Sequence, residues 1–199
     1  MGTRDDLPSR DDIESCRRCP LWERATHGVP GAGSPRARIL CIGEQPGDEE
    51  DRQGEPFVGP AGKLLWRALG EAGLEPRDVF LTNAVKHFSW EPRGKRRIHK
   101  TPGQRAIAAC QEWLEREIAA LRPAVIVALG STALRALLGP GFKVGEARLR
   151  DDLLHASGTR VLATWHPSAV LRAIDEASRS EMYGALVGDL RRARDWAKH

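Results

Sequence analysis

The sequence lacks the features that mark membrane and exported proteins. Within its 199 residues, no apolar run approaches the roughly 20 residues that a membrane-spanning helix needs. The first twelve residues are polar and acidic, without the apolar core of a signal peptide. Asp6 also stands where an N-myristoylation pattern requires serine or threonine. We therefore expect a cytoplasmic protein that does not attach to membranes.

The sequence also has no internal repeat and no long linker. Its 41% hydrophobic and 29% charged residues are typical of a globular protein rather than a disordered or collagenous one. A chain of 199 residues can bury one sizeable core, whereas two full domains would be crowded. We expect residues 1–199 to form a single, monomeric domain whose first twelve or so residues are flexible.

Common nucleotide-binding and deaminase motifs are absent. The segment G-E-Q-P-G at 43–47 does not match the G-x-G-x-x-G spacing of dinucleotide-binding proteins, and Pro46 removes a backbone donor. The sequence has no Walker A motif. Its Cys-x-x-Cys-Pro at 16–20 reverses the Pro-Cys-x-x-Cys of zinc deaminases and lacks their His-x-Glu. These three classes of protein are therefore disfavoured.

What the sequence does contain is an alternation of apolar runs and amphipathic segments. The runs are continuous, which is typical of strands in a parallel sheet covered on both faces. The predicted strands are residues 38–43, 79–83, 124–130 and 160–165. The predicted helices are residues 61–73, 103–121, 131–138 and 176–197, the second with a capping box of Thr101 and Gln104. This order predicts the α/β class, as a three-layer α/β/α sandwich around a central, mainly parallel four-stranded sheet.

Positive charge is concentrated in one segment. The net charge of the chain is +4, but residues 86–105 alone contribute +6, which leaves about −2 for the remainder. Most of this segment lies in an unusually long connection between the second predicted strand and the next helix, and such connections are often functional. The segment indicates an anionic partner such as nucleic acid, with a solvated charged surface as the simpler alternative.

Polar side chains follow three of the predicted strands. Glu44 and Gln45 come after the first strand, Asn83 ends the second, and His166 follows the fourth. Ligands of open α/β sheets bind outside the carboxyl ends of the strands. Each residue alone is more typical of a turn or a helix cap, but together they indicate a shared site.

Three ordered motifs resemble those of a known family. They are GEQPGDEEDRQGEPFVGPAGKLL at 43–65, LTNAVKH at 81–87 and WHPSAVLR at 165–172. They resemble the uracil-DNA glycosylase superfamily, most of all its iron–sulfur family-four branch, over nearly the whole chain from Ile13 to Trp196. The segment GKRRIHK at 94–100 and the Gln45 variant of the first motif resemble the UdgX type, which becomes covalently attached to uracil-containing DNA.

The resemblance implies a pocket for a flipped deoxyuridine at Gly43. Phe57 would stack on the base, and the Asn83 amide complements the O4 acceptor and N3–H donor of uracil. His166 would donate a hydrogen bond to the charge that develops on uracil O2. Glu50 would shape the pocket against the methyl group of thymine.

The resemblance also implies an unusual end to the reaction. Glu44, Gln45 and Asp48 would position a nucleophile or stabilise the sugar cation. His99 would then capture C1′ itself, so that the enzyme stops after one turnover. Two alternatives stay open, namely a multiple-turnover glycosylase that uses water and a non-catalytic iron–sulfur module that only binds DNA.

Further residues are candidates for contact with DNA. They are Lys95, Arg96, Arg97, Lys100, Ser168, Leu171 and Arg172, with Leu171 as a wedge and Arg172 as a phosphate contact. The expected partner is uracil-containing DNA, single- or double-stranded, and the protein would then be nucleoid-associated.

Four cysteines suggest one complete metal site, but their positions divide them. Cys16 and Cys19 have the spacing of two ligands of one metal, which fits zinc as well as an iron–sulfur cluster. The resemblance implies a [4Fe–4S] cluster held by Cys16, Cys19, His87 and Cys110, with histidine where family-four enzymes have cysteine. Cys41 lies within an apolar strand, where an inert core thiol is expected.

Overall fold

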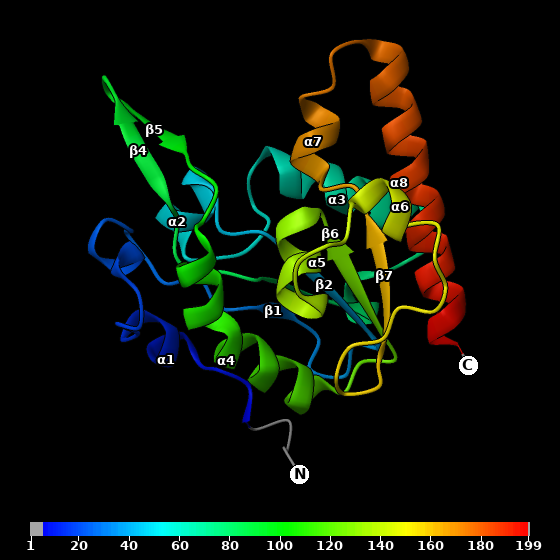
Figure 1. The fold of residues 1–199 in the computed structure, drawn as a ribbon, viewed down its shortest axis with the longest axis horizontal. Helices are drawn as coiled ribbons and strands as arrows, with labels where there is room; N and C mark the ends of the chain where they lie inside the picture. Colours follow the sequence, from blue (N-terminus) through cyan, green and yellow to red (C-terminus); the bar gives the residue numbers. More distant parts are fainter. Residues whose placement is uncertain (1–5, 199) are drawn as a thin grey trace.

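Five strands form the central sheet, in the order β1-β3-β2-β6-β7 (Figure 1). The computed structural model describes residues 6–198. The strands of this sheet are β1 (Ala32–Gly33), β2 (Ile39–Gly43), β3 (Val79–Asn83), β6 (Val125–Leu129) and β7 (Arg160–Thr164). The last four are mutually parallel, and β1, at the edge of the sheet, pairs antiparallel with β3.

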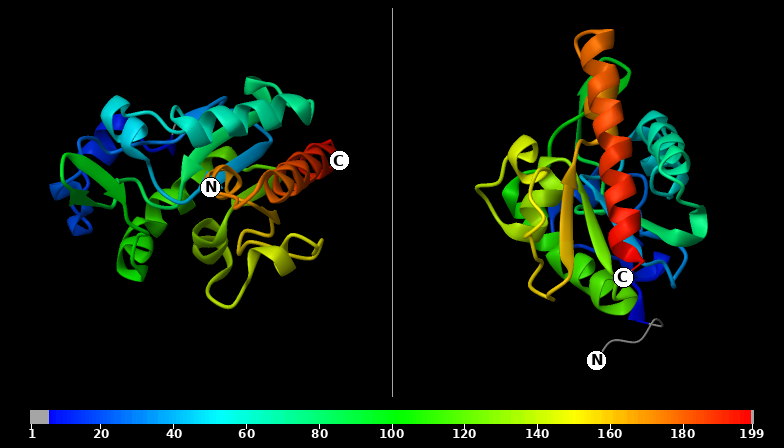
Figure 2. Two further views of the ribbon diagram at one scale, coloured as in Figure 1. Left: turned by 90° about the horizontal axis from the view of Figure 1, so that it is seen from above. Right: turned by 90° about the vertical axis from the view of Figure 1, so that its right-hand side faces the viewer.

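Helices cover both faces of the sheet. The α-helices are α1 (Arg10–Glu14), α2 (Asp48–Gln53), α3 (Pro60–Glu71), α4 (Gln104–Leu121), α5 (Ser131–Leu138), α6 (Val144–Ala147), α7 (Pro167–Leu171) and α8 (Glu176–Ala197). Two 3-10 turns are η2 (Pro20–Glu23) and η3 (Pro76–Asp78). Figure 2 shows α3 and α5 on opposite sides of the sheet.

The continuous apolar runs divide between two cores because successive side chains point to opposite faces of a strand. In β2, Leu40 and Ile42 pack with α4 and α5, whereas Ile39 and Cys41 pack with α3 and α8. All five residues of β2 are buried, as are those of β3 and β6. The three-layer α/β/α sandwich with a mainly parallel sheet is therefore confirmed.

The structure differs from the sequence prediction in several local features. The sheet has a fifth strand, β1, whose two exposed residues carry no apolar signal. The capping box expected at Thr101 is wrong, because α4 begins after Gly103 and has no side-chain cap. The helices expected at 131–138 and 176–197 have the bounds of α5 and α8.

The long connection after β3 contains a second, two-stranded sheet. Strands β4 (Trp90–Arg93) and β5 (Arg96–His99) pair antiparallel, with Trp90 opposite His99. Gly94 lies between them at φ +60°, a left-handed conformation that favours glycine. The hairpin projects from the body of the molecule on one side of the sheet edge, and α7 lies on the other (Figure 1).

The amino-terminal segment packs beside α4. Helix α1 begins after Ser9, which forms a capping box with Asp12. The flexibility expected for the first twelve residues falls partly on residues 1–5, which lie outside the described residues. Between residues 6 and 198, none of the helices has the length and apolar character needed to cross a membrane.

Candidate active site

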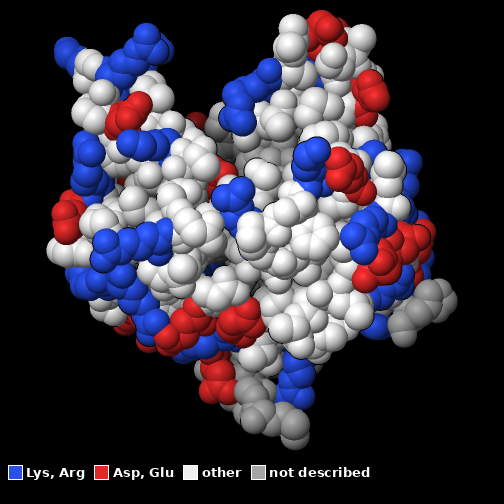
Figure 3. All heavy atoms as spheres, in the orientation of Figure 1, with Lys and Arg blue, Asp and Glu red and all other residues white. Residues whose placement is uncertain are grey.

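A pocket of about 810 Å³ opens between the β4–β5 hairpin and α7, at the carboxyl ends of the strands. Its lining includes Glu44, Gln45, Glu50, Phe57, Asn83, His99, His166, Ser168 and Arg172 from the predicted site. Figure 3 shows a hollow between the two sides, with Lys and Arg side chains on both rims. The parallel strands thus bring together residues that are more than 120 positions apart in the sequence.

Three predicted side chains converge on Gly43. A Cβ atom at this position would lie 2.5 Å from Asn83 Oδ1, 2.7 Å from Phe57 Cζ and 3.5 Å from His166 Nε2. The parallel register pairs Gly43 directly with Asn83. Any larger residue at 43 would fill the space that an amide, an aromatic ring and an imidazole share.

Phe57 owes its position to an unusual backbone conformation. Its φ is +57°, in the left-handed region that non-glycine residues rarely adopt, and its ring is buried. A Cβ atom at Gly62 would lie 1.9 Å from the Phe57 carbonyl oxygen, so α3 approaches this loop as closely as only glycine permits. The ring is therefore presented by a tightly packed loop.

Glu50 connects the two loops that border the pocket. Its carboxylate accepts hydrogen bonds from the backbone N–H groups of Gly47, at 3.1 Å, and Gly59, at 2.7 Å. The side chain is buried, and both oxygens have donors. Although Glu50 lines the pocket, its carboxylate holds the loop that carries Phe57.

The end of β3 is held by a buried ion pair. Lys86 Nζ donates to the Asn83 carbonyl oxygen at 2.9 Å, to Thr82 Oγ1 at 2.6 Å and to Glu117 Oε2 at 2.8 Å. The Lys86 side chain is fully buried. The sequence groups Lys86 with the basic segment, but in the structure its charge is paired inside the protein and stabilises the backbone at Asn83.

His166 has a defined tautomer. Its Nδ1 accepts a hydrogen bond from the backbone N–H of Ser168 at 3.1 Å and lies 2.7 Å from Ser168 Oγ. Burial lowers the pKa of His166 to about 4, so the ring is neutral at neutral pH and its proton is on Nε2. This N–H is the one that lies near Gly43 and can donate to a ligand.

Glu44 and His99 form a couple at the pocket. Glu44 Oε1 lies 3.0 Å from His99 Nε2, and Glu44 Oε2 accepts a hydrogen bond from the Thr132 hydroxyl. Burial raises the pKa of Glu44, but hydrogen bonds from His99 and Thr132 outweigh this effect and hold the pKa below its ordinary value. The carboxylate is thus ionised and can accept a hydrogen bond from His99 Nε2, which leaves Nδ1 as the ring nitrogen that does not face Glu44.

Gln45 holds the base of the hairpin. Its Nε2 donates to the carbonyl oxygens of Ser89, at 3.1 Å, and Lys100, at 3.2 Å, while its Oε1 accepts from Ser89 N–H at 3.0 Å. Lys100 N–H donates in turn to the Ser89 carbonyl oxygen. The amide therefore points to the two residues that flank β4 and β5, and its atoms are engaged with backbone.

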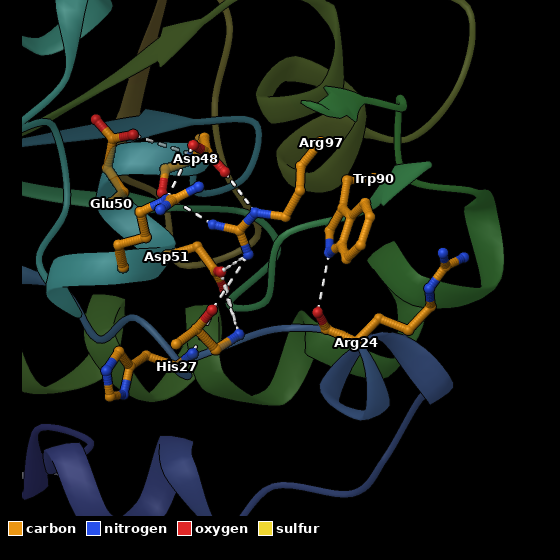
Figure 4. A network of polar contacts seen from close by, with 10 residues as sticks. Arg24, His27, Asp48, Glu50, Asp51, Trp90 and Arg97 are labelled. Carbon is orange, nitrogen blue, oxygen red and sulfur yellow. Dashed lines mark hydrogen bonds and ion pairs between the residues drawn. The ribbon is translucent and has the colours of Figure 1, made fainter. Parts of the chain in front are cut away.

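Arg97 anchors β5 to the amino-terminal half of the chain (Figure 4). Its guanidinium donates to Asp48 Oδ1 and to Asp51 Oδ2, each at 2.5 Å, and to Thr26 Oγ1 at 3.1 Å. It also lies 5.5 Å from the centroid of the Trp90 ring. Asp48 and Arg97 therefore bond to each other. Arg97 lies on β5, two residues before His99.

The remaining candidates for DNA contact lie on the two rims. Lys95 and Arg96 are exposed beside the hairpin turn, and exposed Lys100 forms an ion pair with Glu91 at 3.6 Å. Across the pocket, Arg172 lies in the lining and Leu171 is 40% exposed on α7. These positions leave the side chains accessible from the side on which the pocket opens.

Three of the cysteines gather between the amino-terminal segment and α4. Cys16, Cys19 and Cys110 are buried, and Trp113 Nε1 donates to Cys16 Sγ at 3.3 Å. A hydrogen bond with Cys110 lowers the pKa of Cys19 to about 6 and raises that of Cys110. Cys41 is separate and fully buried in the other core, where burial raises its pKa to about 12.

His87 is the fourth candidate ligand. Its side chain is buried, and burial lowers its pKa, which favours the neutral ring that a metal ligand requires. Within residues 6–198, no three His, Cys, Asp or Glu side chains are arranged to hold a single metal ion. Three buried thiols and a buried imidazole are nevertheless ligand types that iron–sulfur clusters take, so the chemistry of these residues fits such a cluster.

Several residues of the site are not predicted from the sequence. Thr132 follows the carboxyl end of β6, so the same strand-end rule points to it. Asp51 lies one helical turn after Asp48 on α2, a spacing that places two carboxylates on one face. Glu117 gives no such signal. It lies on the amphipathic helix α4 among charged residues that are typical of an exposed face, and its partner Lys86 lies in another part of the chain.

Comparison with known proteins defines the class. The model of the uracil DNA glycosylase superfamily matches residues 30–191, and the chain belongs to this superfamily.

More particularly, the chain is similar to proteins named type-4 uracil-DNA glycosylase. It is 37% identical over 202 residues to that of Thermotoga maritima, covering 100% of this chain and 98% of the relative. It is 38% identical over 168 residues to that of Saccharolobus solfataricus, covering 81% and 74%. The type-5 uracil-DNA glycosylase of Thermus thermophilus is 36% identical over 167 residues, covering 75% and 71%.

Proposed function

We propose that this protein excises uracil from DNA and is then joined through His99 to C1′ of the abasic deoxyribose, as in the UdgX type. The observation that carries the proposal is that the Glu44–His99 couple opens into the same pocket as Phe57, Asn83 and His166. The superfamily and the names of the type-4 relatives support action on uracil in DNA.

The first step is recognition of a base flipped out of the DNA. The uracil ring would lie over Gly43 and against Phe57, where a Cβ atom would otherwise stand. The Asn83 amide offers a donor to O4 and an acceptor to N3–H, whereas cytosine presents the opposite pattern on that edge. The buried Lys86 keeps the end of β3, and hence this amide, in place.

The second step is cleavage of the bond between N1 and C1′. The bonding electrons leave with uracil, which becomes an anion, and C1′ becomes an oxocarbenium-like cation. His166 Nε2–H would donate a hydrogen bond to O2 of the leaving base, an interaction typically worth about 3–4 kcal/mol of transition-state stabilisation. The neutral tautomer set by Ser168 supports this role.

The third step is capture of the cation. The His99 lone pair would form a bond to C1′, and the ring would become an alkylated imidazolium whose remaining proton is held by Glu44. That proton can pass to the uracil anion through solvent, so charges balance and no water is consumed. Because the alkylated nitrogen is a poor leaving group, the reaction stops after one turnover.

A [4Fe–4S] cluster would be held by Cys16, Cys19, His87 and Cys110. When bound, it supplies a cross-link between the amino-terminal segment, α4 and the residues after β3, not a group for the reaction. His87 precedes the hairpin and Cys110 follows it, so this cross-link would fix both ends of the segment that carries His99.

The proposal is tested by incubation with a uracil-containing oligonucleotide and electrophoresis under denaturing conditions. The wild type should give one adduct per protein molecule, and none with thymine in place of uracil. His99→Ser should give no adduct, and released uracil in excess of the enzyme would indicate that water takes the place of the imidazole.

The matched control is His27→Ser, which removes a partly exposed histidine of the amino-terminal segment outside the pocket. It should form the adduct as the wild type does. An adduct that persists in His99→Ser would overturn the role of His99, and many uracils released per wild-type molecule would favour the multiple-turnover alternative.

A further inference from the structure

Thr132 is a buried residue of the pocket that no motif of the sequence marks. It is the second residue of α5, and its side chain lies at the carboxyl end of β6. Its hydroxyl donates to Glu44 Oε2, the oxygen that does not face His99. The two oxygens of Glu44 thus have two different partners, one on α5 and one on β5.

This hydrogen bond is not the usual one for a threonine in a helix. Helical threonine hydroxyls commonly bond to a backbone carbonyl one turn earlier. Here the hydroxyl bonds instead to the carboxylate of Glu44, the residue that follows the neighbouring strand β2. Helix α5 is capped by Gly130, which has no side chain to offer, and Thr132 does not serve as its cap. Its polar contact is therefore tertiary.

The turn that carries Thr132 is fixed against the other half of the site. Gly130 has a φ of +87°, and a Cβ atom there would lie 2.9 Å from His166 Cβ. This close approach leaves the β6–α5 turn little freedom relative to His166. The Glu44 carboxylate, which is hydrogen-bonded to Thr132, is therefore held by the same turn that packs against His166.

We propose that Thr132 is a positioning residue, whose hydroxyl orients the Glu44 carboxylate so that its other oxygen holds His99 for capture of C1′. The inference rests on the function proposed above. An unrestrained carboxylate can rotate about its last carbon–carbon bond and present either oxygen or neither. With Oε2 bound to Thr132, Oε1 remains directed at His99 Nε2.

The test compares two substitutions that differ in the hydroxyl. Thr132→Val keeps the shape of the side chain and removes the donor, and Thr132→Ser keeps the donor. We expect Thr132→Val to slow adduct formation at least tenfold and Thr132→Ser to remain within about threefold of the wild type. Thr159→Val, which removes a threonine hydroxyl outside the pocket that is bonded to Ser157, serves as the matched control and should leave the rate unchanged.

A pH profile separates positioning from a loss of structure. Groups facing Glu44 are His99 from β5, Thr132 from α5 and His166 from the end of β7. Loss of a hydrogen bond to the ionised carboxylate raises its pKa, so the acidic limb of the rate profile should move to higher pH in Thr132→Val. Thermal unfolding of the variant shows whether a slower rate comes from partial unfolding instead.

The inference is overturned if Thr132→Val forms the adduct at the wild-type rate with an unchanged profile. A wild type that forms no adduct overturns the proposed function instead. In that case, NMR titration of the Glu44 carboxyl in the free protein still decides the role of Thr132. A higher pKa in Thr132→Val than in Thr132→Ser supports the contact, and equal values overturn it.

Discussion

At the scale of single residues, the site depends on which atoms are already engaged. Asn83, Phe57 and His166 leave an amide, an aromatic ring and an N–H beside the space above Gly43. Gln45 and Asp48 belong to the same motif as Phe57, at residues 43–65, yet their side chains bond to the β4–β5 hairpin. The difference between binding a ligand and positioning its neighbours is therefore a matter of side-chain direction.

His166 should make the stability of the protein depend on pH. Burial lowers its pKa from 6.5 to about 4, so between these values the unfolded chain binds more protons than the folded one. The free energy of unfolding should therefore fall as the pH decreases from 6.5 toward 4, by up to about 3 kcal/mol from this group. Urea denaturation at pH 7 and pH 4.5 measures this change.

His166→Gln isolates this contribution from that of other groups. Burial lowers the pKa of His87 in the same direction, so the wild type alone does not identify the residue responsible. The variant keeps an amide donor but cannot titrate, and it should lose the His166 share of the pH dependence. An identical pH dependence in both proteins would contradict the assigned burial of a neutral ring.

At the scale of elements, sequence patterns predict those parts of the fold that bury apolar surface. Strands β2, β3, β6 and β7 and helices α5 and α8 follow from runs or periodicities of apolar residues. The β4–β5 hairpin does not, because WEPRGKRRIH has an exposed, charged composition that is typical of a loop. Its strands are specified by contacts with residues distant in the sequence.

Contacts between residues distant in the sequence also limit what can be predicted of the site. The strand-end rule predicts which residues meet at the sheet edge, and Glu44, Asn83 and His166 do meet there. It does not predict the partners of a side chain within that edge. The engagement of Gln45 with Ser89 and Lys100 depends on where the hairpin returns, which no local pattern encodes.

Gln45→Leu should loosen the hairpin without unfolding the protein. The variant loses three hydrogen bonds and leaves the buried Ser89 N–H without its partner, at a cost of about 1–3 kcal/mol. Hydrogen exchange at Ser89 and Lys100 should become faster, and the adduct should form at least tenfold more slowly. Arg97 continues to anchor β5 to Asp48 and Asp51.

Gln111→Leu is the control for this change. Gln111 lies on α4 and donates to Glu115 of the same helix, so its loss removes a glutamine hydrogen bond away from the hairpin. Exchange at Ser89 and adduct formation should be as in the wild type. If Gln45→Leu matches this control in both measurements, the hairpin does not depend on the Gln45 amide.

At the scale of the whole molecule, the amino-terminal segment connects the metal-ligand candidates to the hairpin. Thr26 N–H donates to Asp51 at 2.9 Å, and Val29 N–H donates to the Lys86 carbonyl oxygen at 2.8 Å. Trp90 Nε1 donates to the Arg24 carbonyl oxygen at 2.9 Å (Figure 4). Movement of this segment would therefore be transmitted to both strands of the hairpin.

Cys110→Ala should release this segment if a cluster joins it to α4. We expect the wild type to contain iron and the variant to lose most of it, and residues 10–29 to become sensitive to trypsin at Arg17, Arg18 and Arg24. Cys41→Ala removes an equally buried thiol from the opposite core, at a cost of about 1 kcal/mol, and should keep both its iron and its protease resistance. The sheet face covered by α3 and α8 packs without Cys110, so cleavage should leave the remaining core folded.

Equal iron content in the two variants would exclude Cys110 as a ligand. Loss of iron without cleavage would show that the direct contacts to Asp51, Lys86 and Trp90 are sufficient to hold the segment.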